Sequence, residues 1–251
     1  MNGLQQPDPG FAVTAGLSEA DTSGRPVSGS EGSSAESCRP VERHPFEPFL
    51  PGNAKVLMLG SFPPQPKRWS IEFYYPNFIN DMWRIMGLVF FGDKNRFVDI
   101  GDRKFRLEDI VDFCTEAGIA MYDTATAVRR LKDNAADKFL EVVTPTDIPA
   151  LLRKIPQCQA IVTTGEKATQ TLCETFGATA PQAPGSRSAR KQDGVSAAGY
   201  SVPALGEYSE FVFEGRRMRL YRMPSSSRAY PLSLDRKAAA YRRLFTDLGM
   251  V

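Results

Sequence analysis

Four short runs of apolar residues stand out along the chain, each followed by polar or turn-forming residues. They span residues 55–59, 119–122, 160–163 and 218–223. Continuous apolar runs of this length are typical of strands that are covered on both faces. Residues 211–213, followed by Glu214 and Gly215, predict a hairpin that leads into the fourth run.

Apolar residues at helical spacing separate these runs. The pattern predicts helices over 107–117, 146–155, 167–176 and 234–248, and a further helix that ends near Phe90. Thr146 is the expected cap of the second of these helices. The helix over 107–117 is followed by Gly118, and glycine readily takes the left-handed conformation that closes a helix. Strands that alternate with helices predict an α/β fold, here a three-layer α/β/α domain around a central, mainly parallel, four-stranded sheet.

Two segments lack any such pattern and are rich in Ser, Gly and Pro. They are residues 1–43 and about 180–205. Segments of this composition cannot bury enough apolar surface to offset chain entropy. We therefore expect a disordered tail over 1–43 and a flexible insertion at about 180–205 within one domain that spans 44–251. Deleting residues 1–43 is expected to leave folding nearly intact.

The composition is that of a globular protein, with 42% hydrophobic and 24% charged residues in a chain of 251. No apolar run approaches 18 residues, and the N-terminus has no secretory pattern, so we expect a cytoplasmic protein. The four cysteines, at positions 38, 114, 158 and 173, have no zinc or iron–sulfur spacing. We expect reduced thiols, no metal and no cofactor. The single histidine, His44, excludes mechanisms that need two.

The net charge of +2 is unevenly distributed. Residues 1–43 carry a net charge of −3. Residues 216–243 contain nine basic residues and a single acidic one, Asp235, which gives a net charge of +8. This excess fits an anionic partner, with a phosphate backbone as the first candidate, and DNA binding would then weaken steeply with salt. The solvated faces of strands and helices also collect arginine, so charge alone leaves both readings open.

Polar and turn-forming residues follow each predicted parallel strand. They occupy positions 60–64, 123–124, 164–165 and 224–228. In open α/β sheets ligands bind beyond the carboxyl ends of the strands. We therefore expect a site where these four segments converge.

Three segments, in this order, carry a resemblance to a known family. They read LGSFP at 59–63, YYPNFINDMW at 74–83 and MPSSS at 223–227. The first resembles the Gly-x-x-Pro motif of the uracil-DNA glycosylase superfamily, and the third resembles its Pro-Ser loop. The second is similar to the Tyr-Tyr-x-x-x-x-Asn-x-x-Trp segment of the hypoxanthine-DNA glycosylase and mismatch-specific uracil(thymine)-DNA glycosylase branches. The resemblance spans roughly 44–248 apart from the insertion.

The resemblance implies a monofunctional DNA glycosylase of base-excision repair. Such an enzyme flips a deaminated base, uracil or hypoxanthine, out of DNA and hydrolyses its N-glycosidic bond without metal or cofactor, here as a monomer. The leaving base is anionic, and the backbone N–H groups of Gly60, Ser61 and Phe62 would receive its charge, with Pro63 as a further base-binding residue. Tyr75 aligns with the aromatic residue that stacks on the flipped base.

Two residues are candidates for the chemistry itself. Asn80 aligns with the asparagine of the second segment and would orient the attacking water, or it caps the helix that ends near Phe90. Asp123 is the second candidate, acting on water or on the sugar cation, and the alternative is a buried carboxylate that caps the following turn.

The resemblance implies that the Pro-Ser loop presses into the minor groove and fills the vacated stack, and that its small polar residues and a cation contact the phosphates. The expected contacts are Pro224, Ser225, Ser226, Ser227 and Arg228. Alternatively, the loop caps the final helix. It lacks Gly-x-Ser-x-Gly, which excludes a serine hydrolase of that type.

The chain also departs from the family pattern. Ser61 and Phe62 stand where many members carry Asn or Asp, and Met223 stands where the strongest uracil enzymes carry His. A catalytically inactive nucleic-acid or nucleotide-binding protein of the same fold therefore stays open. A Rossmann-like nucleotide enzyme built on residues 164–168 is a further alternative, although that segment has no Gly-rich phosphate loop.

Overall fold

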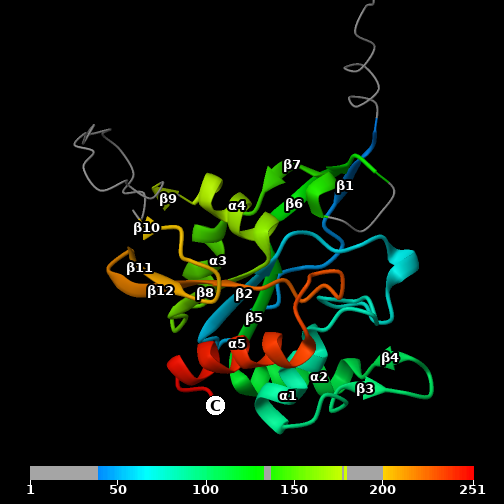
Figure 1. Cartoon of the computed structure of the whole chain (residues 1–251). Coiled ribbons are helices and arrows are strands. Elements are labelled where there is room, and N and C mark those ends of the chain that lie inside the picture. Colours follow the sequence, from blue (N-terminus) through cyan, green and yellow to red (C-terminus); the bar gives the residue numbers. More distant parts are fainter. Residues whose placement is uncertain (1–38, 133–136, 177, 180–199) are drawn as a thin grey trace, which may run out of the picture. The chain divides into compact units, whose positions relative to one another are not determined.

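The main sheet contains all four predicted runs as neighbouring parallel strands. The computed structural model describes residues 39–132, 137–176, 178–179 and 200–251 (Figure 1). The strands are β2 (Val56–Gly60), β5 (Ile119–Asp123), β8 (Ala160–Thr164), β11 (Tyr208–Phe213) and β12 (Arg216–Met223), in the spatial order β11-β12-β8-β2-β5. Every residue of β2, β5 and β8 is buried, as continuous apolar runs predict.

The sheet has five strands, and the prediction of four was wrong in this respect. The hairpin strand β11 pairs antiparallel with β12 over its whole length, from Tyr208 opposite Tyr221 to Phe213 opposite Arg216. It thereby satisfies the backbone groups along the edge of β12, which would otherwise be unpaired.

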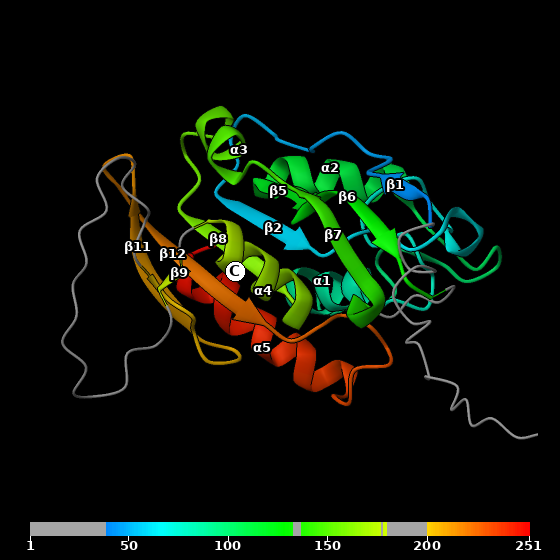
Figure 2. The same cartoon turned by 90° about the horizontal axis from the view of Figure 1, so that it is seen from above.

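In the described ranges, five α-helices pack on the sheet. They are α1 (Met82–Phe91), α2 (Leu107–Ala117), α3 (Ile148–Lys154), α4 (Glu166–Thr175) and α5 (Leu234–Asp247). Figures 1 and 2 place α3 and α4 on one face of the sheet, with α1, α2 and α5 on the other. The expected mixed α/β architecture with a mainly parallel sheet is therefore confirmed.

The helix ends follow local sequence signals. Gly118 closes α2 at φ 72°, as the sequence predicts. Asp147 rather than Thr146 caps α3, because its side chain accepts the Ala150 N–H while the Thr146 hydroxyl donates to the carbonyl of Asp123 (2.7 Å). Ser233 caps α5, so the Pro-Ser loop does not serve as that cap.

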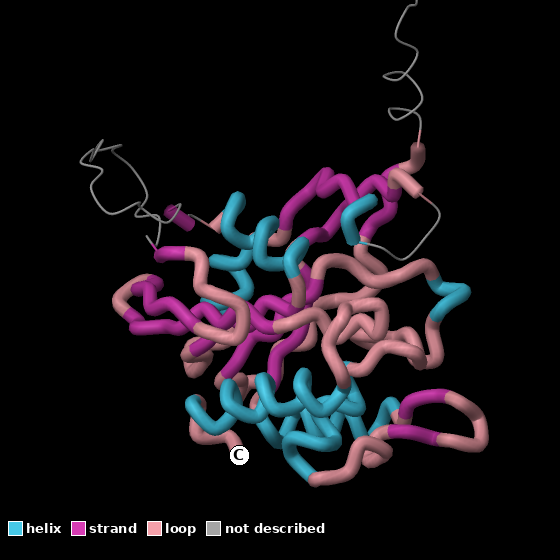
Figure 3. Tube along the Cα trace, in the orientation of Figure 1, coloured by secondary structure: helices cyan, strands magenta, loops and turns pink. Residues whose placement is uncertain are grey.

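A second, antiparallel sheet was not predicted. It has the order β1-β6-β7 and consists of β1 (Val41–Arg43), β6 (Ala125–Arg130) and β7 (Leu140–Pro145) (Figure 3). Residues 41–43 were expected to belong to the tail, but they pair with β6. The folded domain therefore begins before residue 44. Residues 1–38 lie outside the described part of the chain, and their expected disorder stays a prediction.

Short elements complete the described chain. They are β3 (Val98–Asp99), β4 (Lys104–Phe105), β9 (Ala178–Thr179), β10 (Tyr200–Ser201) and two 3₁₀ turns, Pro66–Arg68 and Asp137–Phe139. Strands β9 and β10 pair in parallel, so the expected insertion at about 180–205 is partly structured at its end. Residues 180–199 lie outside the described ranges. In those ranges no helix has the length and apolarity needed to cross a membrane.

The pairing of β1 with β6 makes a prediction about truncation. A chain that begins at Arg39 keeps Glu42, whose carboxylate binds the buried guanidinium of Arg130 through two contacts of 3.0 Å. A chain that begins at residue 44 leaves Arg130 without this partner. Contrary to the expectation that removal of residues 1–43 leaves folding nearly intact, this chain should be less stable by on the order of 3 kcal/mol. Urea unfolding of both chains measures the difference, and equal midpoints would contradict the assignment of β1 to the domain.

Candidate functional site

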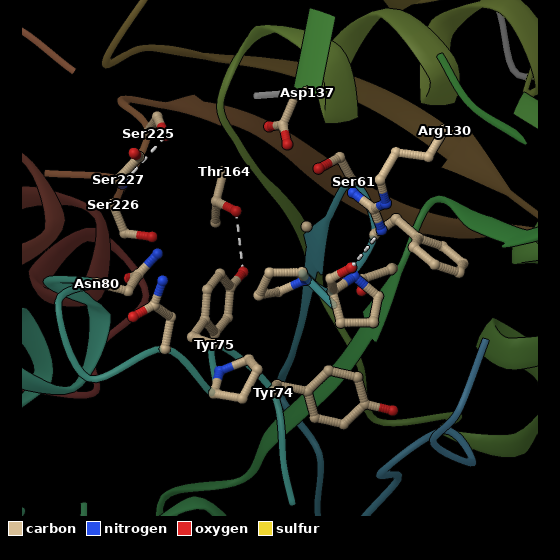
Figure 4. A pocket seen from close by; sticks show the side chains of 17 residues that line it. Ser61, Tyr74, Tyr75, Asn80, Arg130, Asp137, Thr164, Ser225, Ser226 and Ser227 are labelled. Carbon is tan, nitrogen blue, oxygen red and sulfur yellow. Dashed lines mark hydrogen bonds between the residues drawn. The ribbon is translucent and has the colours of Figure 1, made fainter. Parts of the chain in front are cut away.

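A pocket opens at the carboxyl ends of the parallel strands, where the sequence predicts a site. It encloses about 120 Å³ and is shown in Figure 4. Of the predicted residues it gathers Gly60, Ser61, Phe62, Pro63, Tyr75, Asn80, Asp123, Ser225, Ser226 and Ser227. Pro224 is buried behind it, and its carbonyl accepts a hydrogen bond from the Tyr241 hydroxyl (3.0 Å). Arg228 is exposed outside the pocket lining.

Gly60 allows a carboxylate to approach the strand closely. In the register of β2 and β5, Gly60 lies opposite Asp123. A Cβ atom at position 60 would lie 2.4 Å from Oδ1 of Asp123, closer than any side chain permits. The pairing also ends at Gly60, so the sheet does not use the backbone N–H groups of Ser61 and Phe62. They are the donors predicted for the leaving base.

Asp123 is paired with the single histidine of the chain. Nε2 of His44 lies 3.0 Å from Oδ2 of Asp123, and the two side chains are 2% and 9% exposed. Nδ1 of His44 lies 2.8 Å from the carbonyl oxygen of Phe46 and 3.2 Å from its backbone nitrogen, so both ring nitrogens have hydrogen-bond partners. The pairing fixes the orientation of the carboxylate in the pocket. Sequence reasoning missed it because 79 residues separate the partners.

Aromatic rings enclose the imidazole of His44. Phe62 and Phe46 meet it edge-on at centroid distances of 5.4 and 5.9 Å, and Tyr122 lies at 4.6 Å. The rings keep water away from the hydrogen bond to Asp123, and a hydrogen bond is electrostatically stronger in such a low-dielectric surrounding.

A second carboxyl group, that of Asp137, also lines the pocket and was missed by the sequence analysis. Burial raises the pKa of Asp137, a hydrogen bond from Ser61 opposes the shift, and the charge of Asp123 adds to it. Figure 4 shows Asp137 and Ser61 facing one another at the pocket wall. The carboxyl groups of Asp123 and Asp137 therefore line one cavity in different surroundings, an arrangement typical of acid–base sites.

Arg130 holds the loop that follows β2. It is 7% exposed, and besides Glu42 it donates to the carbonyl of Pro63 (3.2 Å). The second sheet thereby fixes the position of the Gly60–Pro63 segment from behind.

Tyr75 forms one wall of the pocket in a constrained conformation. Its φ of 51° is unusual for a residue other than glycine. The Thr164 hydroxyl donates to the carbonyl of Leu59 (3.3 Å), so the Tyr75 phenol donates to Thr164 (2.9 Å). Burial, and then the charge of Asp123, raise the pKa of Tyr75, which keeps the phenol neutral. The ring is thus held in place beside the cavity (Figure 4).

Asn80 lines the pocket and also bonds the start of a helix. Its Oδ1 accepts the N–H of Met82, the first residue of α1, at 2.9 Å, whereas Asp81 occupies the N-cap position and makes no side-chain cap bond. The capping alternative is therefore met only in that Asn80 satisfies one backbone donor at the N-terminus of α1. Its amide N–H₂ group remains as a donor, and a role in positioning water stays a prediction.

A buried ion pair joins the Asn80 segment to the Pro-Ser loop. Nζ of Lys237, a residue with no exposed surface, lies 3.0 Å from Oδ2 of Asp81 and 2.7 Å from the carbonyl of Ser227. The Asp81 N–H donates to the carbonyl of Ser226 (3.0 Å), and Arg228 lies 3.3 Å from Oδ1 of Asp81. We call the pair of Asp81 and Lys237 the Asp81–Lys237 clamp.

Much of the basic stretch over 216–243 has a structural task. Arg216 donates to carbonyls at the end of α3, among them those of Leu152 and Pro156. Arg222 pairs with Glu166, and Lys237 is buried. The charge free to meet a phosphate backbone is therefore smaller than the sequence count of +8 indicates. The role of this stretch in DNA binding stays a prediction.

Comparison with known proteins supports the fold. No protein-family model matches the chain, and no curated protein is found to be similar to it. Ten chains of known structure are similar. One of them is the solution structure of a protein from Methanosarcina acetivorans that is provisionally named a uracil DNA glycosylase, with 18% identity and a TM-score of 0.50 over 83% of this chain and 99% of that one. At this identity the likeness concerns the fold, which is that expected from the resemblance.

In the part of the chain that the structure describes, no three His, Cys, Asp or Glu side chains gather closely enough to hold a metal ion. The expectation that the protein uses neither metal nor cofactor stays a prediction.

The clamp makes a prediction about stability. Lys237→Met leaves the Asp81 carboxylate buried without its main partner, and we expect a loss of about 3 kcal/mol or more. Arg236→Met, at the exposed neighbouring position of α5, is the matched control and should change stability by about 0.5 kcal/mol at most. Chemical unfolding of both variants measures the effect, and similar losses would show that the clamp is not a stabilising contact.

Proposed function

We propose that this protein is a monofunctional DNA glycosylase of base-excision repair that hydrolyses the N-glycosidic bond of a flipped, deaminated base, with uracil preferred. The observation that carries the proposal is the pocket itself. It combines a cavity of one-ring size, two carboxyl groups and a fixed tyrosine at the carboxyl ends of the parallel strands. The three segments that resemble the superfamily meet at this place.

The size of the cavity favours a pyrimidine. An engineered cavity of about 150 Å³ takes up one benzene ring. The pocket, with about 120 Å³, has a similar capacity. Uracil has a single ring, whereas hypoxanthine has two and would extend further toward the open side of the pocket. We therefore expect hypoxanthine to be the poorer substrate.

The pocket offers groups for both partners of the reaction. The bonding electron pair leaves with the base, and the N–H groups of Ser61 and Phe62 receive the negative charge. Water adds to C1′ of the sugar and passes a proton to the Asp123 carboxylate, which His44 orients. The N–H₂ group of Asn80 holds the water oxygen. Tyr75 supplies the surface against which the base stacks.

The rim supplies the contacts to DNA. Ser225 and Ser227 line the pocket mouth, and Arg228 is exposed beside them. Hydroxyl groups and a guanidinium at this place suit the phosphates on either side of a flipped nucleotide. We propose that the protein acts as a monomer on damaged DNA.

Single-turnover kinetics test the proposed function. Duplexes with one uracil, hypoxanthine or xanthine are compared with an undamaged duplex, in buffer with a chelator. We expect release of uracil at the highest rate and no release from the undamaged duplex. DNA binding without release of any base would contradict the proposal and would favour the alternative of an inactive nucleic-acid or nucleotide-binding protein.

Variants of the pocket distinguish the chemical roles. Asp123→Asn and Asn80→Ala should each slow excision by about 10²-fold or more, while affinity for lesion-containing DNA stays near wild type. His44→Gln keeps a donor toward Asp123 and should lose less than His44→Phe. Excision rates and DNA affinities are measured on the same preparations, with unfolding curves as the control. A normal rate per folded molecule in Asn80→Ala would leave that residue with its capping role alone.

A further inference from the structure

An exposed aliphatic side chain belongs to a turn that contributes two residues to the pocket. Ile79 is 49% exposed, and its neighbours Asn77 and Asn80 both line the cavity. We propose that Ile79 inserts into the DNA duplex and fills the space that the flipped nucleotide leaves. The inference rests on the proposed function and adds the element that acts on duplex DNA. Proteins that unstack a base step commonly insert side chains of this type.

The turn that carries Ile79 is held rigidly. The Ile79 N–H donates to Oδ1 of Asn77 (3.1 Å), and the Asn80 N–H donates to the carbonyl of Asn77 (2.8 Å). Arg84 donates to the carbonyls of Phe78 (2.8 Å) and Asn80 (3.1 Å). A side chain on such a turn is ordered before it meets DNA, so insertion does not require the ordering of a loop.

The Pro-Ser loop offers no comparable side chain. Pro224 is buried beneath Tyr241, and Ser226 is 3% exposed. Arg228 is exposed, but it is tied to Asp81. The loop therefore presents hydroxyl groups and charge, while the adjoining Ile79 presents apolar bulk.

The surroundings of Ile79 suit a polyanion. Arg84 lies over the rings of Phe78 and Phe105, at 4.7 and 5.3 Å from their centroids. Burial, and then the nearby charge of Arg228, lower the pKa of Arg84. Arg84, which bonds the turn that carries Ile79, and Arg228 thus lie near one another, with Asp81 as their shared anionic neighbour. Phosphates would offset their repulsion, and a base stack would cover the isoleucine.

A second exposed isoleucine provides the control. Ile100 is 69% exposed and lies between β3 and β4, outside the pocket lining. Ile100→Ala removes the same apolar side chain at a place that the proposal does not use.

The test compares duplex and single-stranded DNA of one sequence with one uracil. Single-turnover excision is measured for wild type, Ile79→Ala, Ile79→Leu and Ile100→Ala. Ile79→Ala should lose about tenfold or more on the duplex and keep its rate on the single strand, where no stack has to be filled. Ile79→Leu and Ile100→Ala should stay near wild type on both. Unchanged duplex excision in Ile79→Ala, or an equal loss on both substrates, would overturn the proposal.

A second signal separates this proposal from the proposed function. With 2-aminopurine beside the uracil, unstacking raises fluorescence whether or not the base is released. We expect a rise with wild type and Ile100→Ala and a much smaller one with Ile79→Ala. If the wild type releases no base, the glycosylase activity is refuted. The fluorescence rise then still tests whether Ile79 inserts into the duplex. Equal rises for all variants would count against insertion.

Discussion

The buried ion pair between Asp81 and Lys237 is the interaction on which the site depends most. It connects the residues before α1, the Pro-Ser loop and α5, three segments that are far apart in the sequence. Burying two charges costs several kcal/mol for each ion, and only good geometry and further hydrogen bonds recover that cost. Here the Ser227 carbonyl and Arg228 complete the pair. The same contacts fix Asn80 and the serines on one side of the pocket.

The opposite side of the pocket is fixed in a comparable way. Arg130 is buried between Glu42 and the carbonyl of Pro63, and it thereby connects the antiparallel sheet to the loop after β2. The absence of a side chain at Gly60 leaves room for the Asp123 carboxylate at the pocket wall. The pocket is thus preorganised from both sides, as a site that stabilises charge in a transition state requires.

The sequence predicts the parts of the fold that local patterns determine. The strands β2, β5 and β8 are continuous apolar runs, and Gly118 closes α2. The pocket residues that it missed depend on partners distant in the chain. His44 meets Asp123 across 79 residues, and Arg130 meets Glu42 across 88. Such long-range pairs leave no periodic pattern of apolar and polar residues in the sequence. Residues 41–43 belong to a strand only because β6 lies beside them.

The central claim is that the pocket receives a base flipped out of DNA. A crystal structure of the protein with a duplex that contains 2′-fluoro-2′-deoxyuridine, whose glycosidic bond resists cleavage, measures this directly. We expect the uracil ring in the pocket against Tyr75, with its edge toward the backbone of Ser61 and Phe62. A uracil that remains stacked in the duplex, or DNA seated away from the carboxyl ends of β2 and β5, would contradict it.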